Sequence, residues 1–281
     1  MTAAALALLA SFSWGTSDFL AGLESRRSTA WTAALGGQTV ASLTLLVLLA
    51  FIGPARPDLG ALVAPAVGGV VGAFGVILGY KALALADMSV VSPIIAGAAL
   101  VPVTWGIATG ERPGSLPVLG IGVTLLGIVV ISRGGPAAAG GGRTRSRAGI
   151  IAAVGCAFTL GLFLVALDYG GDAGPLYTVA VARTTAVLTL VVVVVAARPA
   201  IRLRRRGVPV LLVVGLFIVA ANLLFTSATT YGYLSVVGVL GWLNPAVTMV
   251  WAAAVLGERL RAPQMAAAVL VFSGIVLLTV G

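Results

Sequence analysis

Long apolar segments recur along the whole chain and are separated by short stretches that carry charged residues, Pro and Gly. A helix needs about 20 mainly apolar residues to cross the hydrocarbon core of a bilayer. The segments do not alternate apolar and polar positions, as the strands of a membrane barrel would. The pattern therefore predicts an all-α polytopic membrane protein with ten transmembrane helices. Their expected ranges are 2–22, 30–52, 61–85, 89–109, 114–132, 148–167, 175–197, 208–230, 234–256 and 262–280.

Composition extends the membrane interpretation to the whole chain. Of 281 residues, 60% are hydrophobic and 9% are charged, whereas a soluble domain has about 25% charged residues. The first apolar run has no basic residue before it, so we interpret it as the first span and not as a signal peptide. Abundant Ala, Gly and Arg are typical of a GC-rich bacterial genome. We therefore expect a multi-pass protein of the cell (plasma) membrane, specifically a bacterial inner membrane.

The same composition excludes several kinds of site. Cys156 is the single cysteine and the chain has no histidine, which excludes an intramolecular disulfide, a His-based metal site and a His-containing triad. We expect no metal, no cofactor and no catalytic residues. The formal net charge of +9 is interpreted as loop arginines set by membrane topology, so no nucleic-acid partner is expected.

The second half of the chain resembles the first. QTVASLTLLVLLA at 38–50 aligns with RTTAVLTLVVVVVA from Arg183, and the segment at 110–132 aligns with that at 257–279, each beginning with Gly-Glu-Arg. Five spans are an odd number, so the second copy must enter the membrane in the opposite sense. This predicts two inverted five-helix repeats, with a substrate site between them as in secondary transporters. The first repeat is 1–133, a Gly/Arg-rich linker is 134–147 and the second repeat is 148–281.

Three stretches of the sequence resemble the drug/metabolite transporter superfamily in its ten-span form with two EamA-type domains. They are WGTSDFLAGLESRR in the first span, GYKALALADMSVVSPI across spans three and four, and the GER turn of each half. The resemblance covers the whole chain. It implies transport of small metabolites, often amino acids, by alternating access without ATP, and it favours export. No P-loop pattern is present, so the residues themselves also give no reason to expect an ATPase.

Asp18 is the first candidate for chemistry, because it interrupts an apolar span. It lies four residues after Trp14, so both side chains share a helical face. That face must point into the protein, since a carboxylate facing lipid would cost a few kcal/mol. Two interpretations stay open: a cavity carboxylate that binds a cation or carries a proton, or a helix-end carboxylate that pairs with Arg26 or Arg27. Sequence alignment matches Asp18 with Leu162 in the second repeat.

Arg183 is the deepest arginine, with at least eight uncharged residues on either side. Its counterpart in the first repeat is Gln38. A guanidinium binds a carboxylate through two parallel hydrogen bonds. Arg183 therefore either grips a substrate carboxylate or lines the outer vestibule, or it caps helix-end carbonyls or pairs with Asp168 or Asp172.

Further polar residues gather late in the third span and in spans four, eight and nine. Lys81 either pairs with Asp18 or extends to the membrane surface. The cluster in spans eight and nine is either interhelical polar contact or part of a solute site beside carbonyls freed by Pro245. Span four has a parallel set, Ser92, Pro93, Pro102, Thr104 and Trp105. The candidate cavity residues are Trp14, Asp18, Gln38, Lys81, Arg183, Asn222, Thr226, Trp242, Asn244 and Thr248.

Glu111 and Glu258 lie in the two GER turns, and we interpret both as structural. Each carboxylate is expected to accept hydrogen bonds from free N–H groups at the start of the following helix, or to lie near its positive dipole end.

The favoured function is secondary active transport of a small organic metabolite such as an amino acid, by alternating access with a site between the two repeats and with export favoured by the resemblance, and not catalysis. An intramembrane enzyme acting on a lipid head group is the alternative from another class; the scarcity of acids and the lack of histidine disfavour it. A non-transporting membrane scaffold is the third, and it would not need a deep Asp18 or Arg183. The expected partners are the solute and the lipid bilayer, with proton coupling and a homodimer left open.

Basic residues are distributed unevenly over the connections between spans. Numbered in chain order, the odd connections and their flanks hold fourteen basic residues, whereas the even ones hold Arg56 and Arg112. Basic residues mark the cytoplasmic side, so we expect the odd connections in the cytoplasm and both termini outside. The family resemblance implies the opposite orientation.

Overall fold

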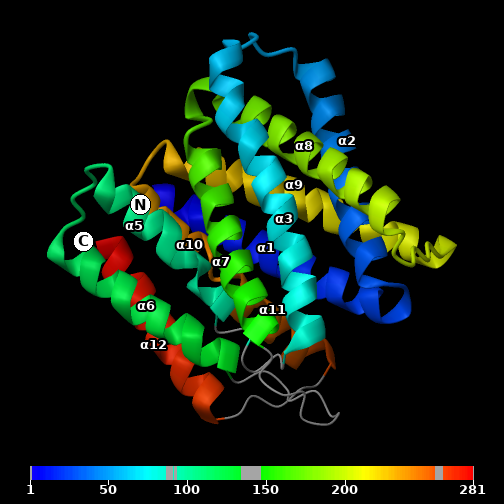
Figure 1. Cartoon of the computed structure of the whole chain (residues 1–281). Coiled ribbons are helices and arrows are strands. Elements are labelled where there is room, and N and C mark those ends of the chain that lie inside the picture. The colour runs from blue at the N-terminus through cyan, green and yellow to red at the C-terminus, as the bar shows by residue number, and fades with distance from the viewer. Residues whose placement is uncertain (1, 87–90, 92–93, 134–146, 257–261, 281) are drawn as a thin grey trace.

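The computed structural model describes residues 2–86, 91, 94–133, 147–256 and 262–280, and over these residues it contains helices and no strand. Figure 1 shows the arrangement. The longer helices are α1 (Thr2–Arg27), α2 (Ala30–Ile52), α3 (Val63–Leu85), α6 (Ser115–Arg133), α7 (Arg147–Asp168), α8 (Gly174–Ala197), α9 (Val208–Thr229), α11 (Asn244–Leu256) and α12 (Ala262–Val280). The shorter ones are η1 (Leu59–Leu62), η2 (Gly97–Ala99), α5 (Leu100–Ala108), η3 (Gly171–Ala173), η4 (Arg205–Gly207) and α10 (Leu234–Gly241).

Seven helical segments of the described chain are long and apolar enough to cross a membrane, which confirms a multi-pass helical membrane protein. They are Thr2–Ser25, Ala30–Ile52, Leu59–Ala82, Arg147–Asp168, Gly171–Ala197, Arg205–Thr229 and Leu234–Leu256. Shorter apolar helices cover the other three expected spans, at Ile94–Ala108, Ser115–Val130 and Ala268–Thr279.

The expected ninth span is not one continuous helix. A turn at Trp242 and Leu243 separates α10 from α11. Pro245 accounts for the break, because it has no backbone N–H to continue the helical hydrogen bonds of α10 and instead occupies the first turn of α11. Below the turn the N–H of Ala246 bonds to the carbonyl of Leu243 at 2.9 Å.

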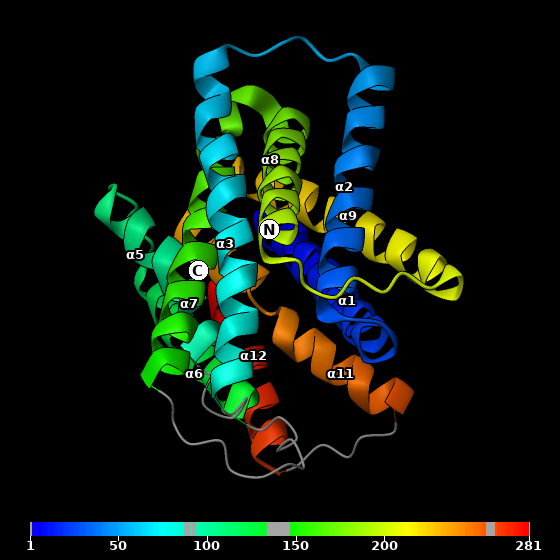
Figure 2. The same ribbon diagram turned by 45° about the vertical axis from the view of Figure 1, so that its right-hand side comes forward.

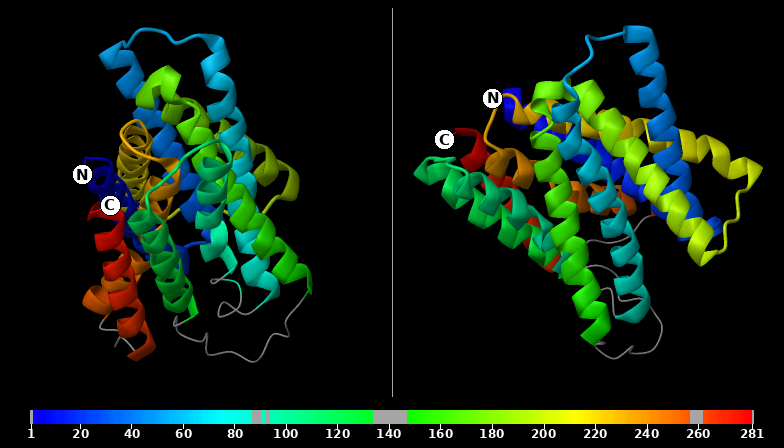
Figure 3. Two further views of the ribbon diagram at one scale, coloured as in Figure 1. Left: turned by 90° about the vertical axis from the view of Figure 1, so that its left-hand side faces the viewer. Right: turned by 45° about the horizontal axis from the view of Figure 1, so that its top comes forward.

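The same helix contacts occur in both halves. α3 packs along α7, and α9 packs along α1; α3 also contacts α8, and α9 contacts α2 (Figure 2). Two further pairs join a helix to its own counterpart, α2 with α8 and α6 with α12, and α5 of the fourth span contacts α10 of the ninth. The first turn of α1 and the last of α12 lie close together in both views of Figure 3.

Two glycines explain how closely the innermost helices approach. A Cβ on Gly15 of α1 would lie 2.5 Å from the Cβ of Val247 in α11. A Cβ on Gly161 of α7 would likewise lie 2.5 Å from the Cβ of Val101 in α5. Small residues permit such contacts between membrane helices. α1 therefore approaches α11 of the second half as closely as α7 approaches α5 of the first half.

Apolar side chains cover the outside of the bundle as well as its core. Phe225 and Leu240 of the largest buried cluster are inaccessible, while Phe51 of α2 is 87% exposed and Phe272 of α12 is 73% exposed. A lipid-facing surface has this composition, because hydrocarbon solvates apolar side chains as well as the protein core does.

Candidate functional site

Arg183 lies where α2, α7, α8 and α9 meet. Its Nη1 donates a hydrogen bond to Oε1 of Gln38 at 3.0 Å, and its Nη2 donates to Oδ1 of Asn222 at 2.5 Å. The guanidinium carbon is 4.5 Å from the ring centroid of Phe163. The side chain is 7% exposed. Two neutral amides and one aromatic face therefore hold a buried cation.

The structure does not pair Arg183 with either of the expected carboxylates. Within the described chain its side-chain contacts are the two amides and the ring, so Asp168 and Asp172 are not its partners. Its Nε has no hydrogen-bond partner among the described residues. A buried charge without a counter-ion is unfavourable. The Nε–H is therefore a donor that the described residues leave unused.

Gln38 and Arg183 occupy aligned positions of the two repeats, and the structure joins them directly. Asn222 fixes the other side of the guanidinium. Its own Nδ2 donates to the carbonyl of Ile218 at 2.6 Å, which orients its oxygen toward Arg183. The bond from Arg183 to Gln38 thus joins the two halves, while the bond to Asn222 lies within the second half.

A second polar cluster joins α1 to α11. Nδ2 of Asn244 donates to Oδ2 of Asp18 at 2.7 Å. The hydroxyl of Thr248 lies 3.1 Å from the carbonyl oxygen of Gly15 and 3.0 Å from that of Asn244. The Asp18 side chain is exposed, and Oδ1 of Asn244 is buried without a partner among the described residues. The cluster therefore offers an accessible carboxylate held in place by an amide.

The remaining candidate residues lie apart from these two clusters. Lys81 is exposed, and no described contact pairs it with Asp18. The ring of Trp14 packs 5.4 Å from that of Phe225. Trp242 packs against the large apolar cluster, and Thr226 is fully buried with no partner for its hydroxyl in the described part of the chain. Of these four residues, Thr226 is the one whose buried polar atom lacks a partner among the described residues.

Glu111 binds a helix start, but not the one expected. Its Oε1 accepts the N–H of Leu234 at 2.6 Å, and its Oε2 accepts the N–H of Ser235 at 3.0 Å. These are the first N–H groups of α10 in the second half, whereas the following helix is α6. The prediction of the following helix was wrong because α5 and α10 lie side by side, which brings the GER turn to the positive end of α10. Glu258 lies outside the described residues, as do Ser92 and Pro93.

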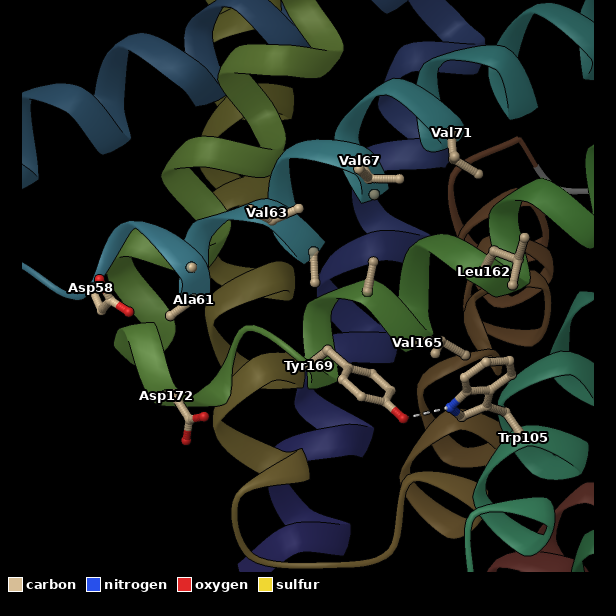
Figure 4. Close-up of a pocket in the computed structure, with 14 residues that line it drawn as sticks. Asp58, Ala61, Val63, Val67, Val71, Trp105, Leu162, Val165, Tyr169 and Asp172 are labelled. Carbon is tan, nitrogen blue, oxygen red and sulfur yellow. Dashed lines mark hydrogen bonds between the residues drawn. The ribbon is translucent and has the colours of Figure 1, made fainter.

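A groove of about 750 Å³ lies between α3, α5 and α7, at the end that carries the even connections (Figure 4). Its walls are mainly valine and alanine side chains. Nε1 of Trp105 donates to the hydroxyl of Tyr169 at 3.2 Å at one edge, and Asp58 and Asp172 lie at the opposite end. The sequence indicated Trp105 but not Tyr169; an aromatic residue at each of two span ends was the available signal.

The model of the EamA-like transporter family matches residues 1–133 and 147–280. No curated protein is significantly similar in sequence. One solved structure, described as "Crystal structure of protein", has a TM-score of 0.82 with this chain at 18% sequence identity, covering 99% of this chain and 96% of that one. That similarity shows a shared fold.

Proposed function

Because the chain belongs to the EamA-like transporter family, we propose that it is a secondary active transporter that exports a small organic metabolite such as an amino acid. The family places the chain in the drug/metabolite transporter superfamily, whose members are transporters and not enzymes. We propose the class of solute, the outward direction of transport and the alternating-access mechanism together, with a bacterial inner membrane as the location.

The proposed architecture has ten spans in two inverted five-helix repeats. Two observations support it: the family model matches the chain in two separate segments, and the helix contacts of one half recur in the other. The solute site then lies between the repeats, as in other inverted-repeat transporters.

The contact of Arg183 with Gln38 and Asn222 carries the proposal. An anionic solute group, such as a carboxylate, would bind the guanidinium more strongly than a neutral amide does. Its arrival would replace amide contacts that join α8 to α2 and α9. Solute binding would thereby change how the two halves are held together, which alternating access requires.

Asp18 is the proposed coupling group. Its carboxylate is accessible and is held by Asn244 on a different helix. A proton on Asp18 would weaken this charge-assisted hydrogen bond between α1 and α11. Protonation would therefore alter a contact between the two repeats, while the solute alters another.

The test is counterflow of radiolabelled amino acids in proteoliposomes that contain the purified protein, with other metabolite classes as comparison. We expect Arg183→Ala and Arg183→Lys both to abolish uptake of an anionic or zwitterionic solute, because a point charge cannot supply the planar fork. Arg112→Gln, on the exposed GER turn, is the matched control. Full uptake by Arg183→Lys would overturn the carboxylate-binding role, and full uptake by Arg183→Ala would overturn the site.

We also propose that the odd connections face the cytoplasm, from the distribution of basic residues. The measurement is labelling by an impermeant thiol reagent in intact cells, in a Cys156→Ala background. Thr230→Cys, in an even connection, is expected to react and Ala200→Cys to be protected. The reverse result would establish the opposite orientation.

A further inference from the structure

The segment between α8 and α9 combines arginines with exposed apolar side chains. It reads Arg-Pro-Ala-Ile-Arg-Leu-Arg-Arg-Arg-Gly from Arg198 to Gly207, and all five of its arginines are exposed. Ile201 is 42% exposed and Leu203 is 63% exposed. The segment connects two membrane-spanning helices, so it lies at the level of the lipid headgroups.

The two kinds of side chain alternate along this segment. No residue from 199 to 204 is helical, and Arg204 has an extended backbone, with φ of −102° and ψ of 138°. Successive side chains of an extended backbone point to opposite sides. Ile201 and Leu203 alternate in sequence with Arg202 and Arg204, so an extended backbone at these residues would put the two kinds of side chain on opposite sides.

Hydrogen bonds fasten the segment to the connection between α1 and α2. The hydroxyl of Thr29 donates to the carbonyl of Ala200 at 2.8 Å, and the N–H of Arg202 donates to the hydroxyl of Thr32 at 2.9 Å. A basic connection that only sets topology needs charge, but it needs no such attachment. A segment fixed beforehand loses less conformational entropy when a ligand binds.

No carboxylate neutralises these arginines in the described part of the chain. Glu24 of α1 lies beside the end of the segment, but its side chain is only 4% exposed. It packs under Gly207, where an added Cβ would lie 2.4 Å from Oε1 of Glu24. Nη1 of Arg204 donates to the carbonyl of Arg27 at 3.5 Å, which leaves the positive charge of the exposed arginines unbalanced by any described acid.

We propose that this segment is a binding site for an anionic phospholipid, with phosphatidylglycerol as the probe. Arg202 and Arg204, with Arg205 and Arg206 after them, bind the headgroup phosphate through guanidinium forks. Ile201 and Leu203 enter the acyl boundary, as the apolar face of an interfacial segment does. The site does not rest on the proposed transport function, because it is separate from both polar clusters.

The test is native mass spectrometry of the purified full chain in neutral detergent, titrated with phosphatidylglycerol or with phosphatidylcholine of the same chain length. We expect phosphatidylglycerol to be retained preferentially. Arg202→Gln with Arg204→Gln should weaken its binding by about thirtyfold, as two basic residues near a charged headgroup would. Arg56→Gln with Arg112→Gln removes the same charge from the even connections and should leave binding unchanged.

Three further measurements keep the result unambiguous. Arg205→Gln with Arg206→Gln is the second pair should the first unfold, as judged by thermal unfolding. Ile201→Ser with Leu203→Ser keeps the charge and should also weaken binding, which separates a lipid from a free phosphate; inorganic phosphate at the same concentration should not displace the lipid. Equal retention of both lipids, equal losses in the control pair, or displacement by inorganic phosphate would overturn the proposal.

Discussion

The two halves of the molecule carry a tryptophan at matching places and use it differently. Val247 and Val101 contact equivalent glycines, and each precedes a tryptophan by four residues. In the second half, Nε1 of Trp251 donates to the hydroxyl of Thr16 at 2.9 Å, and its ring lies 6.3 Å from that of Phe19, with an angle of 21° between the rings. In the first half, Trp105 bonds to Tyr169 at the edge of the groove and is 40% exposed.

The difference follows from what each tryptophan faces. The glycine contacts match Thr16 with Leu162 and Phe19 with Val165, and both Leu162 and Val165 line the groove. Leucine offers no acceptor for the indole N–H, and a buried indole needs one. Trp251 therefore closes against α1, whereas Trp105 turns to Tyr169 and leaves an open groove. On the same helical framework, the half with a hydroxyl acceptor beside its tryptophan is closed here, and the half without one is open.

The packing also corrects one match between the repeats. Sequence alignment pairs Asp18 with Leu162, whereas the equivalent contacts of Gly15 and Gly161 pair it with Leu164. Gaps cannot be placed reliably in apolar sequence, because many registers align leucine with leucine. Both positions hold leucine, so the second half still lacks an acid there.

The largest effect is expected from filling the two helix contacts. Gly15→Leu and Gly161→Leu each place a side chain where even a Cβ would lie 2.5 Å from a valine. Overpacking of this size costs about 3 kcal/mol or more. If the two contacts are equivalent, both variants lose folded protein to a similar extent, measured as the monodisperse fraction after extraction in mild detergent. Gly22→Ala, with nothing within 4 Å of the added Cβ, should behave as the parent.

Removing the tryptophans should separate the closed half from the open one. Trp251→Ala should cost about 3 kcal/mol, as expected for a large packed aromatic. Trp105→Ala should cost about 1 kcal/mol, because its side chain is half exposed and loses mainly one hydrogen bond. Thermal unfolding in detergent measures the difference. Equal losses would show that the two tryptophans are packed alike.

The acid found in one half alone should matter for coupling more than for folding. Asp18→Asn keeps the shape of the side chain but removes the titratable group. We expect transport by proteoliposomes to lose its pH dependence, with the melting temperature close to that of the parent. An unchanged pH profile would assign Asp18 a structural role only. Ser25→Ala, which removes an exposed hydroxyl farther along α1, is the control.

The smallest effect is expected from giving the open half the missing acceptor. Leu162→Thr places a hydroxyl at the position that matches Thr16. Trp105 can then turn from Tyr169 toward α7, so its fluorescence should shift to shorter wavelength and become less sensitive to acrylamide. Leu162→Val is the control, since it shortens the side chain without a hydroxyl. The experiment uses a chain in which the other four tryptophans are phenylalanine, and an identical spectrum in both variants would contradict the assignment.

Much of the architecture could be predicted from the sequence, because its signals are local. An apolar run long enough for the bilayer must form a helix, since no water satisfies its backbone there. Pro245 likewise marks the place where the ninth span breaks. The alignment of Gln38 with Arg183 also identified two positions that the structure joins.

Partner choice was decided by the tertiary structure. Asp168 and Asp172 were sequence-based candidates for Arg183, but α2 and α9 bring amides to it instead. Glu111 in the GER turn of the first half accepts the first N–H groups of α10, because α5 ends beside the start of that helix. The helix faces that meet depend on small residues and close packing between segments far apart in the chain. Apolar periodicity determines that a helix spans the membrane, whereas interhelical packing determines which polar side chains come within hydrogen-bond distance.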